Sequence, residues 1–252
     1  MRKRLIPVLL VDEKHRLVKT EEFGERTYIG DPFNVVRLFN EKEVDEICIL
    51  DIDASRQGRG PDIGFMRELA TECFMPLAYG GGISQLQECE ELNRFGVEKF
   101  VIGSRAANPQ LLKAIAADMG SQALVACVDV KGRGSAARCV QPNSEAPRDP
   151  VEFCLRLQDV GVGEIILQSV TLDGKRSGYD LELINLVTSR LSVPVVALGG
   201  AGNYDHLTEG LRAGASAAAS GSTFTFVGRL RAVLVNYPDP EMLEGMERDA
   251  HA

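Results

Sequence analysis

Short apolar runs alternate with amphipathic stretches along the whole chain. This alternation is typical of repeated βα units around a parallel sheet. Several amphipathic stretches follow an Asp, a Pro or both, which cap free N–H groups or suit the first helical turn; these lie at Asp31-Pro32, Pro61-Asp62, Asp149-Pro150 and Asp180. The apolar runs that predict strands are Leu5–Val11, Ile47–Ile52, Met75–Tyr79, Phe100–Ile102, Ala123–Val128, Ile165–Gln168, Val193–Leu198 and Ala215–Ala219. Eight strands joined by helices predict an α/β fold, the (β/α)8 TIM barrel, with residues 1–252 as a single domain.

An internal repeat divides this pattern into two halves. MPLAYGGGIS resembles VPVVALGGAG, and GVEKFVIGS resembles GASAAASGS. Four pairs share an offset of 118 residues: Gly81 with Gly199, Gly96 with Gly214, Ser104 with Ser222, and Glu46 with Glu164. The sequence therefore predicts two similar half-barrels of four βα units each.

The stretch from Lys131 to Pro150 lacks an apolar pattern. It is rich in Gly, Ser, Arg and Pro, and we expect one long loop inserted within the domain.

Composition and charge exclude several classes of protein. The formal net charge of -8 and a pI near 5.1 disfavour binding to nucleic acid or to a membrane surface, which would need a basic patch. The six cysteines have no CxxC pairs or His clusters, so the sequence indicates no disulfide framework, metal site or cofactor. The apolar run after the basic N-terminus is too short for a signal sequence, and no run approaches a membrane span of about 18 residues. We therefore expect a cytoplasmic location.

Glycine and serine at the ends of predicted strands indicate phosphate binding. In such barrels, phosphates commonly bind to backbone N–H groups after the seventh and eighth strands. Glycine allows close approach of an amide, and a serine hydroxyl adds a donor. The repeat places equivalent residues half a barrel away, so we expect two phosphate sites and an elongated substrate phosphorylated at both ends. The first set is Gly81, Gly82, Gly103 and Ser104; the second is Gly199, Gly200, Gly221 and Ser222. These glycines could also serve only to make tight turns.

Carboxylates at strand ends are candidates for acid–base chemistry. Asp51, Asp53, Asp129 and Asp173 qualify, and Asp129 is the strongest candidate because it closes a fully apolar run. For Asp51, structural hydrogen bonding is at least as good an interpretation. Strand-end carboxylates can also simply cap loops.

Charged residues stand just before four predicted strands. Arg4, Glu46, Lys99 and Glu164 are therefore expected at the opposite, bottom mouth of the barrel, where two acids and two bases could form a ring of ion pairs. Taken alone, such charges are more often a solvated rim.

The motifs RLIPVLL, HRLVK, LDIDAS, YGGGI, ACVDVK, GVGEIILQS, DGKRSGYD and LGGAG resemble the cyclase subunit of imidazole glycerol phosphate synthase, HisF, from about Lys3 to Phe226. The resemblance implies a subunit that takes ammonia from a HisH-type glutaminase at its bottom face and cleaves a bisphosphorylated ribotide. Arg4, Glu46, Lys99 and Glu164 match the family's charged gate for ammonia, with Leu50, Ala78 and Val101 expected along the barrel axis. Lys19, Ser169, Asp173 and Gly174 complete the candidate substrate-binding residues.

The chain departs from the family at one catalytic position. The family uses two aspartates, of which Asp129 matches the second, whereas the first falls on Leu10. Asp12 lies two residues further on, so its side chain is expected on the same face of the strand as that of Leu10 but closer to the top of the barrel. In addition, Thr171 replaces a family Asp, and Gly103 stands where the family usually has Asn.

The combination of motifs is most similar to second paralogues of this subunit, which accompany a glutaminase and an N-acetyl-sugar amidotransferase in surface-polysaccharide loci. The resemblance therefore implies ammonia delivery for amidation of a sugar. The alternatives are a working histidine-pathway cyclase, a non-catalytic ammonia conduit, and a sugar-phosphate isomerase of the related half-barrel family. The gate charges argue against the isomerase, and Leu10 argues against the usual cyclase.

Overall fold

The computed structural model describes residues 3–140, 148–227 and 232–251. Eight parallel strands form a closed ring, in which the last strand pairs with the first. In ring order they are β1 (Arg4–Val11), β4 (Ile47–Asp51), β5 (Leu77–Gly80), β6 (Lys99–Ile102), β7 (Leu124–Lys131), β9 (Glu164–Ser169), β10 (Val195–Leu198) and β11 (Ala217–Ser220). The predicted (β/α)8 barrel is confirmed, with all eight predicted strands present and their ends shifted by up to three residues.

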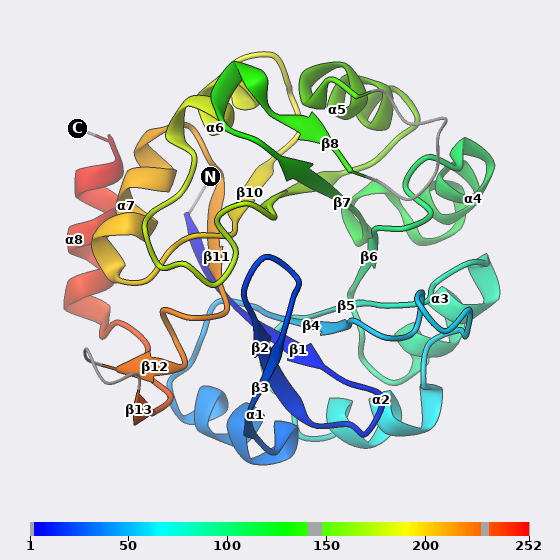
Figure 1. Cartoon of the computed structure of the whole chain (residues 1–252). Helices are drawn as coiled ribbons and strands as arrows, with labels where there is room; N and C mark the ends of the chain where they lie inside the picture. The colour runs from blue at the N-terminus through cyan, green and yellow to red at the C-terminus, as the bar shows by residue number, and fades with distance from the viewer. Residues whose placement is uncertain (1–2, 141–147, 228–231, 252) are drawn as a thin grey trace.

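Helices surround the strands as an outer ring (Figure 1). They are α1 (Pro32–Glu41), α2 (Ile63–Ala70), α3 (Leu86–Arg94), α4 (Pro109–Met119), α5 (Pro150–Asp159), α6 (Leu181–Thr188), α7 (Tyr204–Arg212) and α8 (Pro240–His251). The predicted starts are confirmed, because the side chains of Asp31, Asp62, Asp149 and Asp180 each accept a hydrogen bond from a backbone N–H in the first turn.

Short antiparallel strands extend the sheet at the top face. The hairpin of β2 (Leu17–Thr20) and β3 (Arg26–Gly30) follows β1 and lies in front of the barrel mouth in Figure 1. The strand β8 (Arg138–Cys139) pairs with β7. Away from the barrel sheet, β12 (Phe226–Val227) pairs with β13 (Ala232–Val233), and two short 3-10 turns lie at Ser121–Ala123 and Gly134–Ala136.

The expectation of one loop from Lys131 to Pro150 is wrong in part. β7 runs on to Lys131, a 3-10 turn follows, and β8 returns along β7, with the backbone N–H of Val140 donating to the Asp129 carbonyl at 2.9 Å. Residues 141–147 lie outside the described residues. The polar composition concealed these elements because a short strand paired at the edge of a sheet needs no apolar run.

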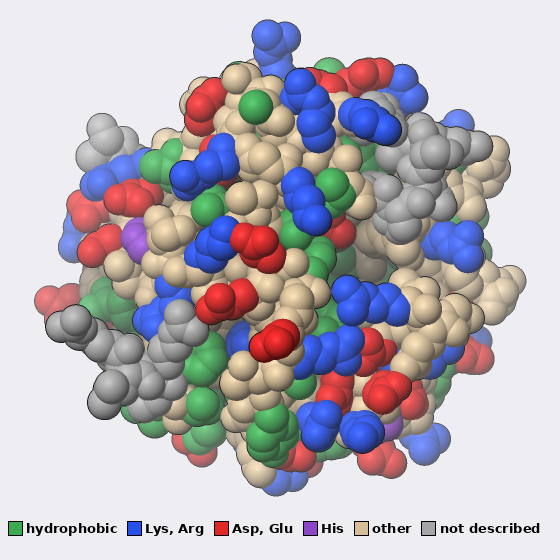
Figure 2. All heavy atoms as spheres, viewed as in Figure 1, with side chains coloured by type: hydrophobic (Ala, Val, Ile, Leu, Met, Phe, Trp, Pro, Cys, Tyr) green, Lys and Arg blue, Asp and Glu red, His purple; other side chains and the backbone are tan. Residues whose placement is uncertain are grey.

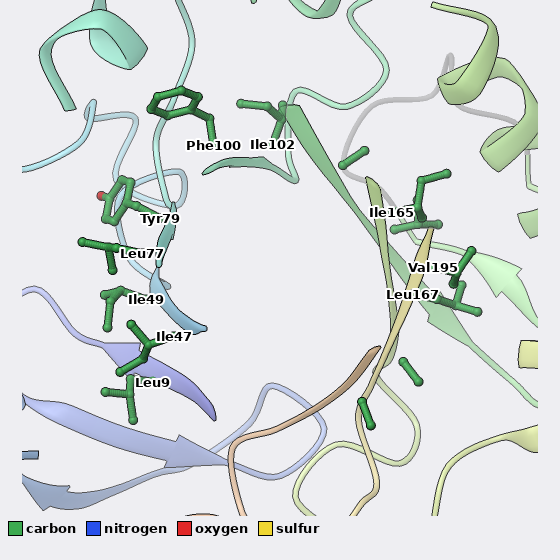
Figure 3. Packing of buried hydrophobic residues seen from close by; sticks show 14 of the residues in the cluster. Leu9, Ile47, Ile49, Leu77, Tyr79, Phe100, Ile102, Ile165, Leu167 and Val195 are labelled. Carbon is green, nitrogen blue, oxygen red and sulfur yellow. The ribbon is translucent and has the colours of Figure 1, made fainter. Parts of the chain in front are cut away.

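Strand alternation creates two hydrophobic layers. Side chains such as Ile49, Leu77 and Phe100 point outward from the strands and are buried against the helices (Figure 3). Alternate residues point inward and form a second cluster on the barrel axis, including Val8, Val101 and Ile166. Each fully buried Leu, Ile or Phe side chain contributes about 1.5–3 kcal/mol to folding.

No helix in residues 3–140, 148–227 or 232–251 combines the length and the apolar character needed to cross a membrane.

Candidate functional site

A cavity of about 470 Å³ opens at the carboxyl ends of the barrel strands. Figure 2 views this face, where acidic and basic side chains both gather around the central hollow. All the predicted catalytic and substrate-binding residues except Ser169 line the cavity: Lys19, Asp51, Gly81, Gly82, Gly103, Ser104, Asp129, Asp173, Gly174, Gly199, Gly200, Gly221 and Ser222. The structure thus brings together residues that lie up to about two hundred positions apart in the sequence.

The repeat is visible in the backbone of the two glycine turns. Gly81 and Gly82 have φ of 134° and 73°, and Gly199 and Gly200 have φ of 94° and 113°. These values favour glycine, and space requires it as well, because a Cβ on Gly82 would lie 2.5 Å from the Arg59 carbonyl oxygen. The tight turns therefore explain in part why the sequence has glycine at these four positions.

Hydroxyl and amide groups converge at the first glycine–serine set. The Ser55 Oγ lies 2.9 Å from the Ser104 Oγ and 3.4 Å from the Gly82 nitrogen, which donates to it. Arg56 also lines the cavity. This end of the cavity offers several donors to an anionic group.

A buried lysine lies beside the second set. The Lys19 ammonium donates to the Val8 carbonyl at 2.9 Å, and a Cβ on Gly221 would overlap its Nζ. Burial lowers the pKa of Lys19 to about 8, and the nearby Asp173 carboxylate opposes that shift. A cation enclosed next to Gly221 and Ser222 is suited to balance an anionic ligand.

Two carboxyl groups on the cavity wall have altered acidity. Burial raises the pKa of Asp129 to about 6, while a hydrogen bond from the Cys127 thiol at 3.6 Å opposes the change. Burial also raises the pKa of Asp173, which accepts hydrogen bonds from Thr20 at 3.0 Å and Gln168 at 3.4 Å. A carboxyl group with a pKa near neutrality is suited to exchange protons with a ligand.

The other strand-end carboxylates have structural partners. Asp51 accepts from the backbone N–H groups of Asp53 and Ala54 at 3.0 Å each and forms an ion pair with Arg59 at 2.8 Å. Asp53 accepts two hydrogen bonds from Arg26, which hold the pKa of its carboxyl below the usual value. The structural interpretation of Asp51 is therefore supported, although its side chain still reaches the cavity wall.

Leu10 faces the cavity and Asp12 does not. Leu10 lines the wall, whereas the buried Asp12 carboxylate accepts hydrogen bonds from the backbone of Lys14 and Arg16 and from the Arg16 guanidinium at 2.7 Å. Asp12 thus closes the turn between β1 and β2 and is not available as an acid or base in the cavity. Thr171 likewise has a structural role, because its hydroxyl accepts from the Gly132 N–H at 3.0 Å.

Ser169 is the one predicted substrate-binding residue that does not line the cavity. Successive side chains of β9 point to opposite faces, and Gln168 faces inward. Ser169 is buried on the other side of the strand. Gln168, and not Ser169, supplies the side chain that reaches the cavity from β9.

The four predicted gate residues form a closed ring of ion pairs at the bottom of the barrel. Arg4 donates to both Glu46 and Glu164, and Lys99 donates to the same two carboxylates at 2.7 Å each. Glu46 and Glu164 are only 4% and 5% exposed, and the two basic side chains are half-buried. The solvated-rim interpretation is therefore wrong, and the ring caps the lower end of the axis.

A small apolar chamber of about 10 Å³ lies on the axis above this ring. That is about the space of one water-sized molecule. Its walls include Cys48, Ala78 and Val101, and Val8 and Val101 also line the upper cavity. Leu50, expected along the axis, lies higher and lines the upper cavity. Ring, chamber and cavity therefore follow one another along a single axis.

Several cavity residues were not among those predicted: Ser55, Arg56, Arg26, Cys127 and Gln168. The alternation of side chains along a strand could have identified Cys127, because it lies two residues before Asp129 and therefore on the same face. Arg26 gave no local signal, because its position depends on Asp53 in another loop. Among the described residues, no group of three or more His, Cys, Asp or Glu side chains could hold a metal ion.

Comparison with known proteins reveals a consistent family. The family model described as histidine biosynthesis protein matches residues 4–230. A relative with the provisional name imidazole glycerol phosphate synthase subunit hisF3, from Vibrio vulnificus (strain YJ016), is 43% identical over 246 residues, covering 95% of this chain and 94% of the relative. The subunit provisionally named hisF2 from Pseudomonas aeruginosa is 43% identical over 249 residues, covering 97% and 99%. The imidazole glycerol phosphate synthase subunit HisF of Exiguobacterium sibiricum is 37% identical over 225 residues, covering 88% and 90%.

Proposed function

The chain belongs to the histidine biosynthesis protein family as a HisF-like subunit, and from this premise we propose that it receives ammonia from a glutaminase and delivers it through its barrel. In this proposal the whole chain acts as one domain in the cytoplasm, and a HisH-type glutaminase binds the bottom face. The ammonia serves amidation of a sugar for surface polysaccharide, with an N-acetyl-sugar amidotransferase as a further partner. The sugar step is supported by the resemblance of the motifs to second paralogues.

The observation that carries the proposal is the alignment of ring, chamber and cavity on one axis. Ammonia is small and neutral, so it can occupy an apolar space of about one water volume without the desolvation penalty of an ion. A ring of two half-buried cations and two buried acids has no evident benefit for stability, because buried ion pairs seldom stabilise more than apolar residues do. In this proposal the ring acts as a gate that admits ammonia to the barrel axis and excludes bulk water.

The upper cavity has the features of a substrate site in this proposal. The two glycine–serine sets bind the two phosphates of an elongated ligand, Lys19 balances the charge at the second set, and Asp129 exchanges protons. Diffraction from crystals soaked in phosphate should reveal an anion at each set. Anions at neither set would remove the bisphosphate substrate from the proposal.

The experiment that tests ammonia delivery uses the complex with its glutaminase. With glutamine labelled with ¹⁵N at the side-chain amide, the complex should release labelled product before labelled ammonia equilibrates with the solvent. Lys99→Met should increase the leakage of labelled ammonia, while Lys113→Met, on the exposed side of α4, should not. No complex with the glutaminase, or leakage equal to that of the unchanged protein, would defeat the proposal.

A second candidate function is the orthodox cyclase reaction. The observation in its favour is Asp129, whose pKa of about 6 suits proton transfer near neutral pH. Against it stands the lack of an acid or base at position 10, because Leu10 occupies that part of the wall and Asp12 is held by Arg16.

Leu10→Asp distinguishes these functions. General acid–base catalysis is typically worth about 10²–10⁴-fold. With free ammonia and the ribotide, the unchanged protein should turn over very slowly, and Leu10→Asp should raise the rate at least about tenfold. If the unchanged protein supports growth of a histidine auxotroph, its function is instead that of the cyclase.

A further inference from the structure

A second cavity, of about 390 Å³, is lined by residues of the turn before β2, of β3, of α1 and its N-terminal cap, and of α2. Figure 1 shows the hairpin, α1 and α2 in the same part of the molecule. The second cavity shares no lining residue with the first cavity. Its volume falls within the range of small-molecule sites, about 300–1,000 Å³. The proposed ammonia path uses none of its residues, so the cavity has no role in the function proposed above.

Four aromatic side chains line this cavity, namely His15, Tyr28, Phe33 and Phe65. The His15 ring stacks on the Phe65 ring, with centroids 4.3 Å apart and planes 11° apart, and Phe33 meets Phe65 edge-on at 5.9 Å. Tyr28 also lines the cavity; it is 59% exposed and has the Arg16 guanidinium 6.0 Å from its ring centroid. Aromatic side chains in a cavity wall can stack on a planar ring or meet it edge-on.

The position of His15 depends on several specific contacts. Its backbone has φ of 56°, an unfavourable value for a residue other than glycine, which costs about 1–3 kcal/mol. The backbone N–H donates to the Asp12 carbonyl at 2.9 Å, and the ring Nε2 is 2.9 Å from an Asp62 carboxylate oxygen. These contacts offset the strain and hold the imidazole in the cavity wall.

The charged groups at the rim fall into two classes. Arg16 is paired with Asp12 at 2.7 Å, and Asp31 caps α1 by accepting from the Asn34 N–H at 3.0 Å. The Lys14 ammonium and the Glu68 carboxylate have no side-chain partner within the described part of the chain. The rim therefore offers one available charge of each sign beside an aromatic interior.

We infer that this second cavity binds a small zwitterion with a planar aromatic side chain, that is, an aromatic α-amino acid. The ring lies between Tyr28 and the stacked His15–Phe65 pair. The carboxylate of the ligand meets Lys14, and its ammonium meets Glu68. Both opposite charges and the aromatic ring are needed to account for the residues that the cavity presents.

The hairpin connects this site with the first cavity. Lys14, His15 and Arg16 precede β2, which carries Lys19 into the first cavity, and Tyr28 lies on β3, which begins at Arg26. A ligand that joins the base of the hairpin to α2 therefore also restrains the segment that covers the first cavity.

L-tryptophan is a suitable probe because the chain contains no tryptophan, so indole fluorescence can be excited at the long-wavelength edge of its absorption, where the five tyrosines of the protein absorb little. A titration of the full chain should give saturable binding. For a ligand of about fifteen non-hydrogen atoms in a partly open site, we expect a dissociation constant on the order of 0.1–1 mM. If no saturable binding is seen up to about 10 mM, which is at least about ten times the expected dissociation constant, the inference is overturned.

Charge variants and an uncharged analogue test the assigned contacts. Lys14→Met and Glu68→Gln alter exposed side chains, so the fold should persist, and each should weaken binding at least about fivefold. Their matched controls, Lys113→Met on α4 and Glu91→Gln on α3, should leave binding unchanged. N-acetyl-tryptophanamide, which has neither charge, should bind at least about tenfold more weakly. Equal binding of this analogue, or unchanged binding by both charge variants, would contradict the inference.

Discussion

Position 10 decides how many proton-transfer groups the first cavity contains. On β1, Arg4, Ile6, Val8 and Leu10 point inward in turn, so one strand contributes to the ring, the chamber and the cavity. With Leu at the top of this series, β1 brings no acid or base into the cavity. The same period of two explains why Gln168, and not Ser169, reaches the cavity from β9.

Asp129 should make the stability of the fold depend on pH. Its folded pKa of about 6 exceeds the value near 3.9 for an unfolded Asp, so the folded state binds more protons between these values. The free energy of unfolding should therefore fall as the pH rises from about 4 to about 6, by about 1–3 kcal/mol from this group. Asp129→Asn should remove that decrease.

Urea denaturation of both proteins from pH 4 to pH 8 measures this effect. Asp129→Asn should be the more stable protein at pH 7, relative to the unchanged protein, and should lose that advantage near pH 4. Parallel stability profiles would mean that the Asp129 pKa is near its unfolded value.

Gly82 and Gly103 should respond differently to the same substitution. Gly82→Ala places a Cβ 2.5 Å from the Arg59 carbonyl oxygen at a φ of 73°, so it should lower the free energy of unfolding by about 2–4 kcal/mol. Gly103→Ala meets its nearest atom, the Cys127 Cβ, at 3.9 Å and should change stability by less than about 0.5 kcal/mol. Chemical denaturation distinguishes the two, and equal effects would show that the Gly82 turn can relax.

At the scale of elements, the β2–β3 hairpin is held from two sides. Arg26 donates to the Asp53 carboxylate after β4, at 2.6 Å for one of its two bonds. Glu22 pairs with Lys175, and the Glu22 N–H donates to the Asp173 carbonyl at 3.2 Å. The hairpin therefore spans the mouth between the two half-barrels.

Arg26→Met should release one side of the hairpin. Asp53 is buried and would lose its guanidinium partner, so we expect amide hydrogen exchange within residues 20–26 to accelerate at least about threefold. The matched variant Arg37→Met breaks the pair between Arg37 on α1 and Glu72 in the turn after α2, and it should leave the hairpin unchanged. Hydrogen exchange followed by mass spectrometry measures both, and equal protection in all three proteins would show that the Glu22 side alone holds the hairpin.

The sequence predicted those elements whose apolar pattern is dictated by burial. The eight barrel strands are buried on both faces, so their runs stand out, and the offset of 118 residues located both glycine turns. The hairpin and β8 escaped prediction because their strands are short, and β3 and β8 are also partly exposed, as at Tyr28 and Arg138. Long-range partnerships such as Arg26 with Asp53 leave no periodic signal, so the residues that close the mouth could not be assigned in advance.

At the scale of the whole molecule, Val8 and Val101 form the boundary between chamber and cavity. Val101→Leu should fill a chamber of only about 10 Å³ and reduce product formation from glutamine at least about fivefold, while added ammonium salt still supports the reaction at the top face. Val130→Leu adds the same methylene group to the outer core layer and is the control. Equal loss with glutamine and with ammonium salt would point to general damage, and no loss with either would mean that ammonia takes another route.

Closure of the ring also has a consequence for the time course of folding. Arg4 on β1 pairs with Ala217 on β11, a separation of 213 residues. During synthesis, one edge of β1 must therefore wait until almost the whole chain has left the ribosome, since non-local pairing closes a long loop and comes late. An enclosed route between the two mouths cannot exist before that final docking, so a nascent or truncated chain that lacks β11 has no closed passage through its centre.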